Sequence, residues 1–182
     1  GGKTLQLAAA GARVSAVDSS RARLGRLREN LERTGLDAEV VEGDAEYWRP
    51  ETPADVLLLD APCSATGTIR RHPDLPRLKG AEDVTRLAAL QARLLSAAPE
   101  MLKPGGRMLY VTCSLQPEEG EAQARWFAES GAGMVPDPVR AEELPGLPEA
   151  LTPEGWVHTL PGYRADSGGM DGFFMARFSK AG

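Results

Sequence analysis

The two cysteines are the residues best suited to covalent chemistry. Cys63 ends the segment DAPC at 60–63 and Cys113 lies within TCS at 112–114, each after a run of apolar residues. A cysteine thiolate is a strong nucleophile where basic groups or a cofactor lower the pKa of the thiol. The alternatives are plain packing, because free cysteine is often buried, and a disulfide between the two. Since both cysteines stand at expected strand ends, we interpret at least one of them as a nucleophile.

Three aspartates occupy similar places along the chain. Asp18, Asp44 and Asp60 each follow a short apolar run that is typical of a β-strand. Open α/β sheets bind ligands at the carboxyl ends of their strands, where an acid such as Asp18 can accept hydrogen bonds from a ribose diol. Asp44 could reach an adenine amino group in the same way. One such acid often only caps a helix, but three in succession indicate a nucleoside-cofactor site.

Alternating strands and helices must position these side chains. Apolar periodicity predicts helices over 4–10, 21–33, 83–102 and 117–129, and strands over 13–17, 39–41, 55–59, 107–113, 156–160 and 172–178. This alternation predicts an α/β fold with a mostly parallel sheet, helices on both faces and a C-terminal antiparallel edge. No internal repeat or second domain is evident.

The chain opens on the segment GGKT at 1–4, with no strand before the glycines. Glycines that open a helix normally follow a strand, because the turn between them presents backbone N–H groups to a ligand. We therefore expect a fragment whose first strand would precede Gly1 and lie in the middle of the sheet. The same segment matches the tail of a phosphate-binding P-loop, but an ATPase would leave both cysteines without a role.

Composition and charge are ordinary for one globular domain of 182 residues with a net charge of −5. No apolar run approaches the roughly 20 residues that span a membrane, and no signal peptide or metal-ligand cluster is evident. We expect a cytoplasmic protein with no membrane or metal partner.

The acidic balance alone does not indicate nucleic-acid binding. Arg70, Arg71 and His72 nevertheless lie in the loop after Cys63 and are candidates for phosphate contact, with His72 also a candidate base or loop-fixing residue.

Taken together, these motifs resemble the Nol/Nop/Sun family of RNA cytosine-5 methyltransferases, and most closely its bacterial Sun/Fmu (RsmB-type) group acting on 16S ribosomal RNA. The combination of Pro-Cys and Thr-Cys at successive strand ends is its most specific feature. The matching segments span nearly the whole chain: GGKT at 1–4, Asp18 with Arg23-Leu24, GDA at 43–45, DAPCSATG at 60–67, RRHPD at 70–74, KPGGRMLYVTCSL at 103–115 and DGFFMARF at 171–178.

The resemblance implies a Rossmann-like methyltransferase fold in which residues 1–182 form a single catalytic domain, truncated at the N-terminus, that uses S-adenosylmethionine. It implies that Cys113 is the nucleophile and that Cys63 assists departure of the methylated product. In DNA cytosine methyltransferases the Pro-Cys cysteine attacks instead, which leaves the opposite assignment open. The implied cofactor contacts are Gly1, Gly2 and Lys3 on the methionine side, Asp18 at the ribose, Asp44 at the adenine and Asp60 between donor and target base.

The implied chemistry explains why a thiol is needed. Addition of a thiolate to C6 of cytosine gives C5 enamine character, so that C5 can take a methyl group from a sulfonium. We expect Asp60 to support the charge near N3, and the target base to be single-stranded or flipped out. We expect residues 1–182 alone to bind cofactor weakly and to methylate RNA poorly or not at all.

Two other functions stay open at this point. One is a methyltransferase with another acceptor, in which the cysteines only pack. The other is a non-catalytic module of the same fold that binds RNA or a protein partner.

Overall fold

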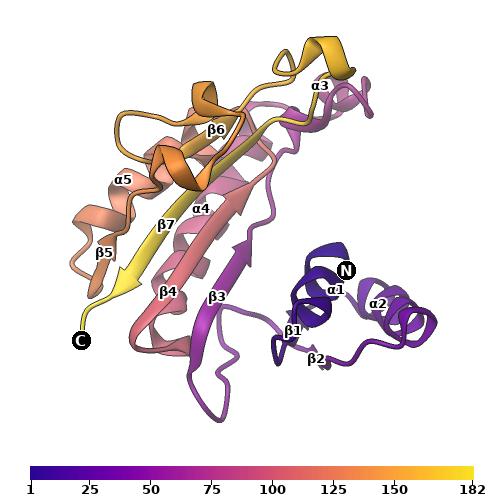
Figure 1. The fold of residues 1–182 in the computed structure, drawn as a ribbon, viewed down its shortest axis with the longest axis vertical. Helices are drawn as coiled ribbons and strands as arrows, with labels where there is room; N and C mark the ends of the chain where they lie inside the picture. The colour runs from indigo at the N-terminus through magenta and orange to yellow at the C-terminus, as the bar shows by residue number, and fades with distance from the viewer. The chain divides into compact units, whose positions relative to one another are not determined.

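The computed structural model describes residues 1–182 as two compact units, Gly1–Arg49 and Pro50–Gly182 (Figure 1). In the first unit β1 and β2 pair in parallel, with Asp18 opposite Glu42. Its helices and strands are α1 (Gly2–Ala9), β1 (Ser15–Asp18), α2 (Arg21–Thr34) and β2 (Glu39–Glu42).

Local sequence signals determine where α2 begins and ends. The Ser20 side chain accepts a hydrogen bond from the Arg23 N–H at 3.4 Å and so caps the first turn. Gly35 ends the helix in the left-handed region, with φ at 65°, which glycine adopts without a steric penalty. The buried face of α2 is the apolar stripe that the sequence predicts, made of Leu24, Leu27 and Leu31.

The second unit is built on a mixed sheet. Its strand order is β3-β4-β7-β5, and β6 also pairs with β7. Its helices and strands are β3 (Ala54–Asp60), α3 (Leu75–Leu78), α4 (Ala81–Ala97), β4 (Leu102–Thr112), α5 (Glu121–Glu129), β5 (Met134–Pro136), β6 (Val157–Thr159) and β7 (Phe173–Lys180). Six short 3-10 helices lie between them, at 66–68, 98–101, 117–119, 141–143, 148–150 and 165–167.

The strand directions confirm the predicted α/β class. β3 and β4 are parallel, whereas β7 runs antiparallel to β4, β5 and β6. The predicted pairing of the last two strands is therefore present, but β7 lies inside the sheet and not at its rim. No helix is long and apolar enough to cross a bilayer.

The main core lies between this sheet and the helices α4 and α5, which cover one of its faces (Figure 1). Alternate residues of β7 point into it, because successive side chains of a strand face opposite sides. Phe127 of α5 meets Phe178 edge to face, with ring centroids 5.0 Å apart. The other large buried side chains include Leu95, Leu102, Met108, Tyr110 and Phe174.

Candidate active site

The ends of β3 and β4 bring the two cysteines together. These strands are parallel neighbours with Asp60 opposite Val111, so the loops that follow them leave the sheet at the same edge. The Sγ atoms of Cys63 and Cys113 are 3.5 Å apart, and both thiols are reduced and partly buried. The structure thus joins the two residues that the sequence singles out, without a disulfide.

The surroundings distinguish the two thiols. The pKa of the Cys63 thiol is raised far above its ordinary value, first by its contact with Cys113 and then by burial. Cys63 is therefore protonated at neutral pH, and its S–H can donate to the Cys113 sulfur. The pKa of Arg71 is raised chiefly by Asp171 and, to a smaller extent, by Cys113. Either sulfur can donate in the Sγ–Sγ contact, and the raised pKa of Cys63 favours Cys63 as the donor.

One buried carboxylate joins the two cysteine loops. The side chain of Glu119 is completely buried. It accepts hydrogen bonds from the N–H and Oγ of Ser64, at 2.9 and 2.5 Å, and from Oγ of Ser114 at 2.6 Å. These serines directly follow Cys63 and Cys113. In the sequence, Glu119 belongs to an acidic run at the start of a predicted helix, which is typical of a solvated end. The serine after each cysteine is the only local signal for this network.

A close backbone approach fixes the loop that leaves Cys63. The Gly67 N–H donates to the Cys113 carbonyl at 2.9 Å, and the Gly67 carbonyl accepts from the Gly172 N–H at 2.8 Å. Ala65, two residues earlier, has φ at 60°. A non-glycine residue in this region stores strain of about 1 kcal/mol or more and is most often found at functional sites.

Replacing Gly67 by alanine should therefore destabilise the second unit. The added Cβ would lie 2.1 Å from the Gly172 carbonyl oxygen and 2.9 Å from that of Cys113, so backbone must move. We expect a loss of about 1–3 kcal/mol in the free energy of unfolding, measured by urea denaturation. Gly162→Ala is the control, since a Cβ there meets nothing within 4 Å. Equal stability of the two variants would contradict this account.

The predicted phosphate-contact residues lie in the same loop but already have partners. Arg71 binds Asp171 through Nε at 2.9 Å and through a second, shorter Nη2 contact. Arg70 donates to the Gly168 carbonyl at 2.7 Å and lies 3.7 Å from Asp171. Both arginines remain about half exposed, and His72 is exposed as well. The loop is thus tied to the turn before β7, with its cations still accessible to solvent.

The predicted cofactor residues of the first unit lie at one edge of its sheet. Asp18 accepts from Arg23 Nε and Nη2, both at 2.8 Å, and from the Ser20 N–H at 2.7 Å. Partial burial acts to raise the pKa of Asp18, but these contacts outweigh it and the pKa lies below its ordinary value. Asp44 lies just beyond β2, is exposed and accepts from the Glu46 N–H at 2.9 Å. The Gly43 N–H reaches the Asp18 carbonyl at 3.2 Å, so the two acids are near neighbours in this unit.

The glycine segment opens α1. Gly1 caps the helix, and its carbonyl accepts from the Leu5 N–H at 3.0 Å. A Cβ at Gly1 would lie 2.5 Å from Cδ1 of Leu27, so the absence of a side chain permits close packing on α2. Gly2 and Lys3 form the exposed first turn. In the second unit, Asp60 is exposed at the end of β3.

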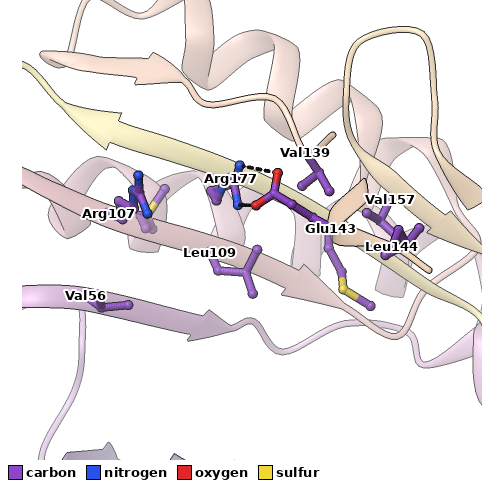
Figure 2. Close-up of a pocket in the computed structure, with 10 residues that line it drawn as sticks. Val56, Arg107, Leu109, Val139, Glu143, Leu144, Val157 and Arg177 are labelled. Atoms are coloured by element: carbon purple, nitrogen blue, oxygen red, sulfur yellow. Dashed lines mark hydrogen bonds and ion pairs between the residues drawn. The ribbon is translucent and has the colours of Figure 1, made fainter. Parts of the chain in front are cut away.

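A separate groove of about 450 Å³ lies on the sheet face opposite α4 and α5 (Figure 2). It is mainly apolar, and at its margin Glu143 pairs with Arg177 at 2.8 Å. This groove contains neither cysteine and none of the predicted site residues, so we do not assign the chemistry to it. Its lining residues are Val56, Arg107, Met108, Leu109, Val139, Glu143, Leu144, Val157, Met175 and Arg177.

Comparison with known proteins gives consistent matches. Residues 1–179 match the family described as 16S rRNA methyltransferase RsmB/F. The chain is 44% identical over 185 residues to ribosomal RNA small subunit methyltransferase B of Salmonella arizonae, a match that covers 99% of this chain and 40% of that protein. It is also 44% identical over 170 residues to the protein of the same name from Vibrio cholerae, covering 92% of this chain and 36% of that protein.

A solved structure supports the same fold. The structure of NSun6 from Pyrococcus horikoshii with SFG has a TM-score of 0.80 and 27% identity, and the match covers all of this chain and 46% of that one. This likeness confirms the predicted Rossmann-like methyltransferase fold. The chain spans about 40% of the length of the first curated relative.

Proposed function

Because the chain belongs to the 16S rRNA methyltransferase RsmB/F family, we propose that it is the catalytic part of an RNA cytosine-5 methyltransferase acting on small-subunit ribosomal RNA. The observation that carries this proposal is the pair of reduced cysteine sulfurs 3.5 Å apart at the ends of two parallel strands. A methyltransferase acting on an oxygen or nitrogen atom needs no such pair, whereas methylation of C5 requires a nucleophile at C6.

Cys113 is the proposed nucleophile. Its Sγ forms a bond to C6 of cytosine, so that electron density moves to C5. After methylation, a base removes the C5 proton and the C6–S bond breaks, which restores the C5–C6 double bond and the free thiolate. We propose that the Cys63 thiol, whose pKa is raised and whose sulfur lies 3.5 Å from that of Cys113, donates a hydrogen bond to the Cys113 sulfur as it leaves. Asp60 is our proposal for the acid that faces N3 of the base.

The proposed methyl donor is S-adenosylmethionine, which supplies a sulfonium methyl group when bound. The related NSun6 structure was determined with SFG, an analogue of this cofactor. The acids of the first unit fit such a ligand, because carboxylates at the ends of neighbouring parallel strands can accept the hydrogen bonds of a ribose and an adenine. We propose Asp18 and Asp44 for these contacts and Gly1, Gly2 and Lys3 for the methionine side.

We propose that RNA contacts the loop that carries Arg70, Arg71 and His72. Both arginines stay partly exposed beside the cysteine loops, and guanidinium groups are suited to phosphate oxygens. Their bonds to the segment before β7 hold them in place, which lowers the entropy lost on binding.

Trapping with RNA that carries 5-fluorocytosine tests this function directly. Fluorine does not leave C5 as a proton does, so the enzyme should stay attached to the RNA once the methyl group has been transferred. We expect a covalent band on a denaturing gel that requires S-adenosylmethionine, and 5-methylcytosine in the unmodified RNA by mass spectrometry. The natural full-length protein and a ribosomal RNA substrate should be used.

Other results would favour the other two functions. Methylation of RNA at a different atom, without a trapped band, would indicate another acceptor and packed cysteines. RNA binding with neither methylation nor a band would indicate a binding module.

A further inference from the structure

The geometry points to Glu119 as a positioning residue of the cysteine pair. We propose that its carboxylate fixes the position of the Cys63 loop relative to the Cys113 loop, so that the Cys63 thiol stays in contact with the Cys113 sulfur during the reaction. This inference rests on the proposed function, in which Cys113 attacks the base. Glu119 itself is completely buried and would not touch substrate or cofactor.

Both oxygens of this carboxylate accept hydrogen bonds from the loops that carry the cysteines. Oε2 accepts from Ser64 Oγ at 2.5 Å and from Ser114 Oγ at 2.6 Å, and the two hydroxyls are 3.1 Å from each other. Oε1 accepts from the Ser64 N–H at 2.9 Å and from Gln91 Nε2 at 3.2 Å. The same Gln91 amide donates to the Pro62 carbonyl at 2.9 Å, which adds α4 to the support of the Cys63 loop.

A tyrosine of β4 also holds the backbone of Glu119. The Tyr110 hydroxyl donates to the Glu119 carbonyl at 2.7 Å, and Tyr110 belongs to β4, the strand that ends beside Cys113. Burial raises the pKa of Tyr110 well above its ordinary value, so this hydroxyl remains a donor at every working pH. The backbone of Glu119 is thus anchored to β4, the strand that leads to Cys113.

A carboxylate fits this place better than an amide does. All four groups around it are donors in the observed arrangement, and an ionised carboxylate offers acceptors only. A glutamine would place an NH₂ group opposite two of those donors and would keep the other contacts. An alanine would remove the acceptor that all four share in a buried space, where unsatisfied polar groups are costly.

The test measures how well the two sulfurs are held, independently of RNA. Oxidised glutathione should convert the two thiols to a Cys63–Cys113 disulfide, the two electrons passing to glutathione. The reaction should be fast in the natural protein, because the sulfurs are close. We expect it to be about tenfold slower in Glu119→Ala, since loss of orientation lowers the effective concentration of one thiol at the other. Peptide mapping by mass spectrometry follows the product.

Kinetics of methylation supply the second readout. We expect kcat to fall about 100-fold in Glu119→Ala and about tenfold in Glu119→Gln, because small displacements of reacting groups cost rate steeply. KM for RNA should change little, since Glu119 is not exposed to it. Glu118→Ala is the matched control, because Glu118 is the exposed neighbour in the same 3-10 helix.

The outcomes separate this inference from the proposed function. Unchanged cross-linking and unchanged kcat in Glu119→Ala would overturn it, even if the melting temperature falls, because the role would then be only structural. If Glu119→Ala does not fold, the same comparison with Glu119→Gln decides. If no variant forms an adduct with 5-fluorocytosine RNA but Glu119→Ala still slows cross-linking, the cysteine mechanism fails while the positioning of the loops stands.

Discussion

Replacing Cys113 by serine should abolish both methylation of cytosine and the covalent protein–RNA adduct. A serine hydroxyl is almost fully protonated at neutral pH and adds poorly to C6, so the first bond of the reaction would not form. Loss of a covalent nucleophile typically lowers kcat by roughly 10⁴-fold or more. Transfer of a labelled methyl group and trapping with 5-fluorocytosine RNA measure the two effects in parallel.

Controls make the Cys113 result specific. Serine is close to cysteine in size, so we expect unchanged thermal unfolding and unchanged binding of S-adenosylmethionine. Full activity in Cys113→Ser would show that this cysteine only packs, and would support a methyltransferase with another acceptor.

Replacing Cys63 by alanine should make the covalent adduct accumulate on ordinary, unfluorinated RNA. The reason is the position of the Cys63 thiol, which is protonated and lies 3.5 Å from the sulfur that must leave C6. Removal of this donor should slow departure more than attack, by about 10²–10⁴-fold as is usual for general acids. The adduct is measured on a denaturing gel and the turnover by methyl transfer.

The double variant Cys63→Ala with Cys113→Ser is the decisive control for this second prediction. It should form no adduct at all, because the nucleophile is absent. If the adduct instead disappears in Cys63→Ala and persists in Cys113→Ser, the roles of the two cysteines are exchanged and the Pro-Cys cysteine attacks.

Helices with a regular apolar stripe could be predicted closely from the sequence. The helix predicted over 21–33 is α2, Arg21–Thr34, because its cap and its terminal glycine are local signals. The helix predicted over 83–102 is α4, Ala81–Ala97, followed by a 3-10 helix over 98–101. The apolar spacing continues past the end of α4, but Pro99 has no N–H to donate to the preceding turn, and the α-helical ladder stops there.

Short elements without their own periodicity escaped prediction. β5 has only three residues, Met134–Pro136, and is defined by its pairing with β7. Likewise, β7 reads as a strand from its alternating residues, but its place between β4 and β5 depends on pairings with segments up to about 70 residues away in the chain. Such pairings leave no mark in a local window of sequence.

From residue types at strand ends we predicted the kind of chemistry, because such types are local facts: cysteines after two apolar strands and acids after others. The folded chain added that the two sulfurs lie 3.5 Å apart, that contact with Cys113 raises the pKa of the Cys63 thiol and that Arg71 is held by Asp171. The folded chain also showed that Glu119 is buried and binds both cysteine loops, whereas its place in an acidic run of the sequence is typical of an exposed helix end. Distance, burial and protonation arise from packing among segments that are remote in sequence, whereas periodicity and motif spacing describe only neighbours along the chain.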